Sequence, residues 1–364
     1  MNRAARPVPV LHINDCAFTT TVLMREAGRR ALPWEYLPLA VTEPSWRGAT
    51  RVVRRALRGA GWEARLAGAA RRADLLHIHF ATVVRHAGWV PRPHVLHLHG
   101  TDARSYQYDR RLGPLVRRAI ERADAVLYST PDLAPHVDWR PDATLLPVPI
   151  DTTALPVWAP AERPRVVFAS RWHEVKGLAV QLAVAELLSR RLGNDVELVG
   201  VDWGPGAGLA RAAGVRLVPK ADHATFQRLL ATAHVVVGQP TGMLAASELE
   251  ALGIGVPVVA PLHGPWYRAS GAAIPPVLGG VDLGAAYALP SQDPTVPGAR
   301  ALERGEERVL AEGIATAVVG ALGEPGGVSA GIDAAAWLAR EHGSASAVDA
   351  LLPLYDRVMA EREA

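Results

Sequence analysis

Short apolar runs alternate with longer amphipathic stretches along this chain. Uninterrupted apolar runs are typical of strands buried on both faces, and amphipathic stretches are typical of helices that cover a sheet. Their alternation therefore predicts an α/β fold with parallel sheets. In the first part of the chain the expected strands are 8–13, 36–41, 75–79, 95–99, 125–128 and 144–148, and the expected helices are 19–30, 51–72 and 115–121.

The alternation begins again after a proline-rich segment at 151–164, which is typical of a linker. The pattern predicts two Rossmann-like, doubly wound domains facing a central cleft, at 1–155 and 156–345, with a C-terminal helix at 346–364 packing back on the first domain. The second set of expected strands is 165–169, 196–201, 215–218, 234–237 and 257–260, and the helices are 178–192, 225–232, 245–252, 334–341 and 347–360. Ligands of such folds bind at the carboxyl ends of strands.

Composition narrows the class of protein. The 364 residues are 49% apolar and 21% charged, which excludes a disordered chain. The single cysteine, Cys16, excludes a disulfide-built secreted module. We expect no signal peptide, and no apolar run reaches the ~18 residues of a transmembrane helix. A cytoplasmic protein is predicted.

Charge is divided unevenly along the chain. Residues 1–155 hold 22 arginines, no lysine and 14 acidic residues, a net charge of +8, whereas the rest has 17 basic and 22 acidic residues. The segment 51–72 reads as a basic amphipathic helix, or as two helices broken near Gly59. It could lie on the anionic inner face of a membrane or be an ordinary solvated helix. No nucleic-acid motif is present, so a nucleic-acid partner is not expected.

Two expected strands end in alternating histidines, at 77 and 79 and at 97 and 99. No cysteine or carboxylate lies at ligand spacing from them, so buried, hydrogen-bonded rings are expected rather than a metal site. His99 stands apart because Gly100, Thr101 and Asp102 follow it directly. This sequence predicts an imidazole at the sheet edge beside a turn and a carboxylate.

Two cations flank the turn after the first strand of the second domain. Arg171 and Lys176 lie five residues apart, just before a helix, and Lys220 is the only other lysine in the chain. Fixed cations beside the free amides of a helix N-terminus favour a diphosphate site. Two solvated surface cations are the alternative.

A glycine- and proline-rich loop, a helix and a turn into a strand occupy 238–259. Glu248 and Glu250 are too close in sequence to share a helix face, so only one of them can point toward a ligand. A carboxylate there suits the two hydroxyls of a ribose, which can donate to both its oxygens.

Together these clusters resemble the GT-B glycosyltransferases, specifically the retaining family 4. In that family a strand ending in His-Gly supplies a histidine, matched by His99. Arg, four residues and then Lys-Gly clamp the donor diphosphate, matched by Arg171 and Lys176. A Glu-Ala-x-x-x-Gly-x-Pro-Val run supplies the ribose-binding glutamate, matched by Glu250.

The chain departs from the family at two places. The usual glutamate eight residues before the ribose-binding one is replaced by Gly242, and the usual Gly-Gly loop is replaced by residues 14–21. The resemblance implies catalytic roles for His99, Arg171 and Lys176, donor binding by Lys220, Gly242, Met243, Leu244 and Glu250, and an acceptor side formed by Asn14, Asp15, Asp102 and Tyr106.

The implied activity is retaining, metal-independent sugar transfer from a UDP- or GDP-sugar to a small hydroxyl or amine acceptor, without a cofactor. The first domain would bind the acceptor and the second the donor. Two other functions remain open: a nucleotide-sugar epimerase or hydrolase on the same fold, and a non-catalytic homologue that binds a nucleotide sugar, an interpretation that Gly242 keeps open.

Overall fold

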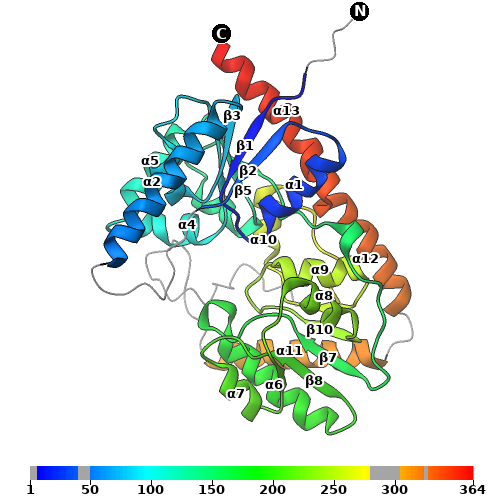
Figure 1. Ribbon diagram of the computed structural model, residues 1–364. Helices are drawn as coiled ribbons and strands as arrows, with labels where there is room; N and C mark the ends of the chain where they lie inside the picture. The colour runs from blue at the N-terminus through cyan, green and yellow to red at the C-terminus, as the bar shows by residue number, and fades with distance from the viewer. Residues whose placement is uncertain (1–5, 40–49, 279–303, 324–326, 364) are drawn as a thin grey trace, which may run out of the picture. The chain divides into compact units, whose positions relative to one another are not determined.

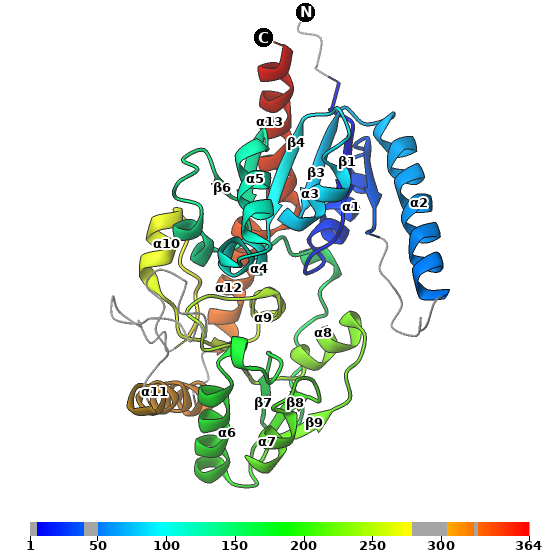
Figure 2. The same ribbon diagram turned by 90° about the vertical axis from the view of Figure 1, so that its left-hand side faces the viewer.

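The computed structural model describes residues 6–39, 50–278, 304–323 and 327–363. The chain divides into two compact units, one made of residues 1–149 with 344–364 and the other of residues 150–343. Each unit contains one sheet whose described strands all pair in parallel (Figures 1 and 2). The predicted α/β class with two parallel sheets is therefore confirmed.

The first unit has a six-stranded sheet in the order β2-β1-β3-β4-β5-β6. Because sequential strands are added first on one side of β1 and then on the other, the winding reverses between β1 and β3. The elements are β1 (Val10–Ile13), α1 (Thr19–Arg29), β2 (Trp34–Leu37), α2 (Thr50–Ala70), β3 (Leu75–His79), α3 (Val84–Ala87), β4 (His94–Leu98), α4 (Thr101–Arg104), α5 (Gly113–Arg122), β5 (Ala125–Tyr128), β6 (Thr144–Leu145) and α13 (Ser344–Glu363), with short 3-10 helices at Ala81–Val83, Tyr106–Tyr108 and Pro131–His136.

Successive side chains along these strands point to opposite faces of the sheet, so they contribute to two hydrophobic cores, one on each face. Val10, Leu75 and Val95 pack with residues of α1 and α13, so the C-terminal helix belongs to this unit. The opposite face packs on α2 and α5. All of these strands except the edge strands are buried on both faces, which explains their continuous apolar sequences.

The second unit has a five-stranded sheet in the order β11-β10-β7-β8-β9, and its winding reverses between β7 and β10. Helices α6, α7 and α11 share one core with the sheet. The elements are β7 (Arg165–Phe168), α6 (Leu178–Leu192), β8 (Glu197–Val201), α7 (Ala207–Ala212), β9 (Arg216–Val218), α8 (His223–Ala231), β10 (Val235–Val237), α9 (Ala246–Ile254), β11 (Val258–Val259), α10 (Gly264–Ser270), α11 (Arg304–Gly323) and α12 (Gly327–His342), with 3-10 helices at Thr152–Ala154 and Glu174–Lys176.

Helix α2 is continuous through Gly59, so of the two alternatives left by the sequence, one helix or two broken near Gly59, the structure has the single helix. Its second half is anchored because Trp62 and Leu66 are buried against the sheet, and this packing outweighs the ~1 kcal/mol that a helical glycine costs. Val52, Val53 and Leu57 of the first half are exposed. None of the helices described is long and apolar enough to cross a bilayer.

Edge strands differ most from the sequence prediction. β6 has two residues instead of the five expected at 144–148, and β11 has two instead of the four expected at 257–260. An edge strand has one neighbour, so hydrogen bonding ends sooner than the apolar sequence does. The expected strand 36–41 begins earlier, at Trp34, and its last two residues lie outside the described part. Helix α11 was not predicted.

Candidate functional site

The turn after β7 lies at the point where the winding of the second sheet reverses. It carries Arg171 and Lys176, both half-buried, into the N-terminus of α6. The Lys176 ammonium donates to Gln239 Oε1 at 2.6 Å, and Gln239 follows β10. This bond connects the ends of the two strands that flank the reversal, the place where ligands of doubly wound sheets bind.

Gly177 fixes the shape of that turn. Its φ is +69°, and a Cβ on it would lie 2.6 Å from Cγ of Pro240. Only glycine fits both the left-handed backbone and this close approach. The Lys-Gly pair of the sequence motif thus has a steric reason: the lysine turn packs directly on the loop after β10.

Glu248 is fully buried, and its carboxylate accepts hydrogen bonds from groups of the protein. It accepts the Gln239 amide at 2.8 Å, the Ala245 amide at 3.1 Å and the Ser170 hydroxyl at 3.3 Å. Burial raises its pKa, and the Lys176 ammonium opposes that rise. Glu248 therefore holds the start of α9 against the ends of β7 and β10.

Glu250 is the other member of the carboxylate pair. Its Oε1 lies 2.5 Å from His223 Nε2 and accepts from Gln227 Nε2 at 2.9 Å. Both partners come from α8, and Glu250 itself is 4% exposed. The sequence prediction that the two carboxylates take different directions agrees with these separate partners.

Trp203, which follows β8, has two cations near its ring: Lys220, which follows β9, and Arg171, which follows β7. The Lys220 ammonium is 4.2 Å from the centre of the Trp203 ring, and the Arg171 guanidinium carbon is 5.5 Å from it. Trp203 is 44% exposed. Among the residues that the structure describes, the buried Nε of Arg171 has no hydrogen-bond partner. The guanidinium is therefore held by a ring face and keeps a donor available for an anion.

The loop that carries Gly242 is closely packed. Gly242 has φ +80°, and a Cβ there would lie 3.0 Å from side-chain atoms of both His263 and Trp266. Met243 and Leu244 are buried, and the Met243 carbonyl accepts from Gln239 Nε2 at 3.2 Å. The absent glutamate is thus replaced by a glycine that the backbone and its neighbours require.

In the first unit, His99 and Asp102 follow β4. Asp102 is fully buried, and its carboxylate accepts the backbone amides of Ala81, His99 and Ala103, each at 3.0 Å. The bond from Ala81 joins the segment after β3 to the segment after β4, and the other two lie within the segment after β4, so Asp102 shapes the loop on which His99 lies. Burial raises the pKa of this carboxyl group.

The other residues expected on the acceptor side also have structural partners. Asn14 donates to the His79 carbonyl at 3.0 Å, and Asp15 accepts the Thr20 amide at 2.9 Å and so caps α1. The Tyr106 ring packs edge-on against Phe80. Non-glycine residues with positive φ gather here, namely Asn14, Ala17, Phe18 and Phe80. Such strained backbone is common at functional sites.

The structure therefore groups the predicted residues by unit. Arg171, Lys176, Lys220, Glu250 and the segment 242–244 all follow strands of the second sheet, whereas His99 and the acceptor-side residues belong to the first. Sequence reasoning missed the partners Ser170, Trp203, His223, Gln227 and Gln239. Only the positions of Ser170, Trp203 and Gln239 just after strands could have indicated them.

Comparisons with known proteins address the fold. No family model matches the chain, and no curated protein matches it. Solved structures do match. A sucrose-phosphate synthase from Thermosynechococcus elongatus superposes with a TM-score of 0.65 and 16% identity, over 97% of this chain and 100% of that one.

Two further solved structures match over nearly the whole chain. HepE from Anabaena, in complex with UDP-glucose, has a TM-score of 0.63 and 15% identity over 96% of this chain and 99% of its own. A putative UDP-N-acetylglucosamine 2-epimerase from Listeria monocytogenes has a TM-score of 0.57 and 16% identity over 98% of this chain and 97% of its own. These likenesses show that the chain has the GT-B fold.

Proposed function

We propose that the protein is a glycosyltransferase that takes a sugar from a nucleoside diphosphate donor. The observation that carries the proposal is the turn of Arg171 and Lys176 at the winding reversal of the second sheet, with an unpartnered, buried guanidinium nitrogen among the described residues. Two fixed cations beside the amides of α6 form a site for a diphosphate. The fold shared with a sucrose-phosphate synthase and with HepE, whose structure contains UDP-glucose, supports this proposal.

The chemistry follows from where charge develops. The bond between the anomeric carbon and the diphosphate oxygen breaks, and the electron pair stays on the diphosphate. Arg171 and Lys176 stabilise this leaving group electrostatically and do not need to reorganise, because the turn is already fixed by Gly177 and Gln239. The acceptor oxygen bonds to the anomeric carbon, and its proton leaves with the diphosphate. A retaining, metal-independent reaction is part of the proposal.

Glu250 binds the ribose of the donor. Its Oε1 is oriented by His223 and Gln227, so the carboxylate is positioned before the ligand arrives. The two ribose hydroxyls donate to this group, and a UDP- or GDP-sugar satisfies that chemistry. His99, with the loop of residues 14–21, faces the sugar and the acceptor in this proposal.

Lysine 176 provides the decisive variant. Lys176→Ala should lower turnover of a UDP- or GDP-sugar at least a hundredfold, about 2.7 kcal/mol in the barrier, while the circular dichroism spectrum is unchanged. Arg190→Ala is the matched control, because Arg190 lies on α6, the helix that follows the turn of Lys176, and its side chain is 67% exposed. Near-normal turnover of the Lys176→Ala variant would contradict the proposal.

Hydrolysis or epimerisation is separated from transfer by omitting the acceptor. A transferase should consume donor only when an acceptor is present, whereas an epimerase or hydrolase should consume it alone. Product analysis of the two incubations by mass spectrometry and NMR tells these reactions apart. A protein that binds the donor in calorimetry and converts it in neither incubation is a non-catalytic homologue.

We propose further that the first half of α2 binds an anionic lipid surface. Val52, Val53 and Leu57 are 70%, 60% and 68% exposed. Arg54 and Arg55 lie beside them in the sequence. In the proposed complex the apolar side chains contact the lipid acyl chains and the arginines pair with the lipid phosphates. Cosedimentation with vesicles containing phosphatidylglycerol should occur and should be lost in the Val53→Ser/Leu57→Ser variant. Equal sedimentation with phosphatidylcholine vesicles would contradict the proposal.

A further inference from the structure

Five histidines lie on one face of the first sheet. His12 is on β1, His77 and His79 are on β3, His97 is on β4, and His99 follows β4 directly. The register places His12 opposite His77 and His79 opposite His97, so the rings form a continuous layer. The first four are fully buried, and His99 is only partly buried. The layer thus runs from the core to the carboxyl edge of the sheet.

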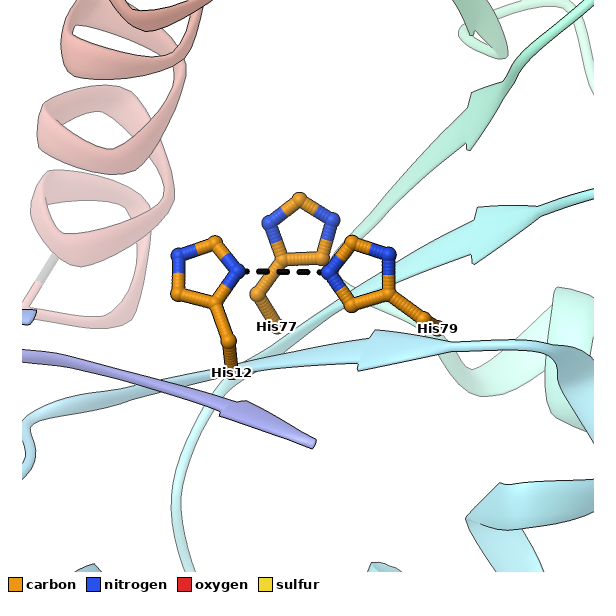
Figure 3. A group of neighbouring side chains, drawn as sticks. All are labelled: His12, His77 and His79. Atoms are coloured by element: carbon orange, nitrogen blue, oxygen red, sulfur yellow. Dashed lines mark hydrogen bonds between the residues drawn. The ribbon is translucent and has the colours of Figure 1, made fainter. Parts of the chain in front are cut away.

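Two hydrogen bonds join three of these rings into a chain. His12 Nδ1 lies 3.2 Å from His79 Nε2 (Figure 3), and His79 Nδ1 lies 3.1 Å from His99 Nε2. Both nitrogens of His79 are used. His97 is packed against the chain but has no hydrogen-bond partner for either nitrogen among the described residues.

The rings are neutral because burial disfavours the charged form. It lowers the pKa of His12 and of His99 to about 3 and that of His79 well below its usual range. A neutral imidazole has one N–H and one lone pair. Along the chain, the tautomer of one ring therefore determines that of the next: either His12 and His79 both donate toward His99, or His99 and His79 both donate toward His12.

A metal site is the other arrangement that clustered histidines suggest. One nitrogen from each of His12, His77 and His79 lies within 4.8 Å of the others, and the same holds for His79, His97 and His99. In the first group, the His77 and His79 rings are parallel to within 5° with centres 4.3 Å apart. Lone pairs lie in the ring plane, so those of stacked rings run side by side and do not converge on one ion. In the second group, His79 Nδ1 and His99 Nε2 share a hydrogen bond of 3.1 Å, so only one of these two nitrogens has a lone pair to offer.

The two unpaired ends of the chain set its direction. His12 Nε2 is buried without a hydrogen-bond partner among the described residues, whereas His99 is only partly buried. A buried N–H without an acceptor is rarer than a buried lone pair without a donor, so His12 Nε2 carries the lone pair and the unpaired N–H lies on His99 at the sheet edge. His12 then has its proton on Nδ1 and donates to His79, and His79 donates to His99.

We propose that His12 and His79 are positioning residues that hold His99 as a neutral imidazole protonated on Nδ1. His99 Nε2 accepts from His79, so Nδ1–H is the group left available at the sheet edge. His99 is therefore a hydrogen-bond donor for a ligand oxygen and not a general base. That this oxygen belongs to the sugar or acceptor rests on the proposed function; the tautomer itself does not.

Nitrogen-15 NMR of histidine-labelled protein tests the tautomer directly, because protonated and unprotonated ring nitrogens have very different chemical shifts. In the wild-type protein at pH 7.5, His99 should show a protonated Nδ1. In His12→Phe the chain loses its first donor, and His99 should shift toward a mixture of tautomers. The control is His97→Phe, which removes an equally buried histidine outside the chain; its ring centre lies 4.2 Å from that of His99, so small shifts are expected, but His99 Nδ1 should stay protonated.

Three outcomes would overturn the proposal: a wild-type His99 protonated on Nε2, no response to His12→Phe, or joint shifts of several rings on addition of one equivalent of Zn²⁺. If the protein transfers sugar, His12→Phe should lower kcat about tenfold with little change in donor KM. A failure of that assay with the expected NMR result would count against the proposed function and leave the tautomer assignment in place.

Discussion

The two sheets have similar α/β frameworks, but the side chains at their carboxyl edges differ in charge: His99 of the first unit is neutral, and those of the second unit are mostly cationic. In the first unit the edge is reached by the neutral, partly buried imidazole of His99, and the fully buried carboxylate of Asp102 accepts backbone amides. The second unit presents Arg171, Lys176 and Lys220 with a glutamate whose partners orient it. The fold therefore determines where a ligand binds, at the carboxyl edge of a sheet. The side chains that follow the strands determine whether that edge is charged or neutral.

The largest effect that the comparison predicts is on acid stability. Four fully buried histidines of the first unit have folded-state pKa values below the unfolded value of about 6.5. The unfolded chain therefore binds more protons as pH falls below 6.5, and stability is lost. For His12, whose folded-state pKa is about 3, the loss between pH 7 and pH 5 should be about 2 kcal/mol, and His77, His79 and His97 add losses of the same sign.

Hydrogen–deuterium exchange with mass spectrometry, corrected for the intrinsic rate at each pH, resolves this prediction by unit. Peptides of β1, β3 and β4 should lose protection at pH 5, while those of β7, β8 and β10 should retain it. Equal protection of both sheets at pH 5 would contradict the contrast between the two edges.

The second prediction concerns the turn of the cationic edge. Gly177→Ala should destabilise the protein by about 3 kcal/mol, since Ala is strained at positive φ and its Cβ would overlap Pro240. Gly271→Ala is the control, because φ there is +70° in the same left-handed region but nothing lies within 4 Å of the new Cβ. It should cost about 1 kcal/mol. Urea unfolding measures both, and equal costs would show that the turn does not need its close contact.

Introducing at position 242 the glutamate that is usual in the retaining family 4 glycosyltransferases should not raise the turnover of this protein. Gly242→Glu should lose about 2 kcal/mol of stability because of the positive φ and the contacts with His263 and Trp266, and its turnover should not increase. Gly242→Ala, which adds only the Cβ, should show most of the same loss. A Gly242→Glu protein that is both stable and more active would mean that the loop accommodates the carboxylate.

The smallest expected effect is on ribose binding. Glu250→Gln should raise donor KM about tenfold, or about 1.4 kcal/mol, with little change in kcat, because an amide offers one acceptor oxygen to the two hydroxyls. Glu186→Gln on the exposed face of α6 is the control and should leave KM unchanged. An unchanged KM for Glu250→Gln would exclude it as a donor ligand.

The sequence was sufficient for features that depend on local pattern. Strands such as β3 and β5, and the helix α6, match their expected ranges because continuous apolar runs and periodicity are local signals. The anion site at Arg171 and Lys176 could be predicted because both residues lie in the turn between an expected strand and an expected helix.

Features that depend on distant partners could not be predicted. The buried role of Glu248 is created by Ser170 and Gln239 from other elements, and the partners of Glu250 come from α8. Nor does a single sequence show that Trp62 and Leu66 would hold α2 together through Gly59. Each of these depends on side chains that only the folded sheet brings into contact.

A crystal structure with a bound nucleoside diphosphate tests the central claim most directly. The diphosphate oxygens should lie within hydrogen-bond distance of the Arg171 guanidinium and the Lys176 ammonium, with the ribose hydroxyls at Glu250. A diphosphate bound away from the turn after β7, with Lys176 still bonded only to groups of the protein, would contradict the assignment of this edge.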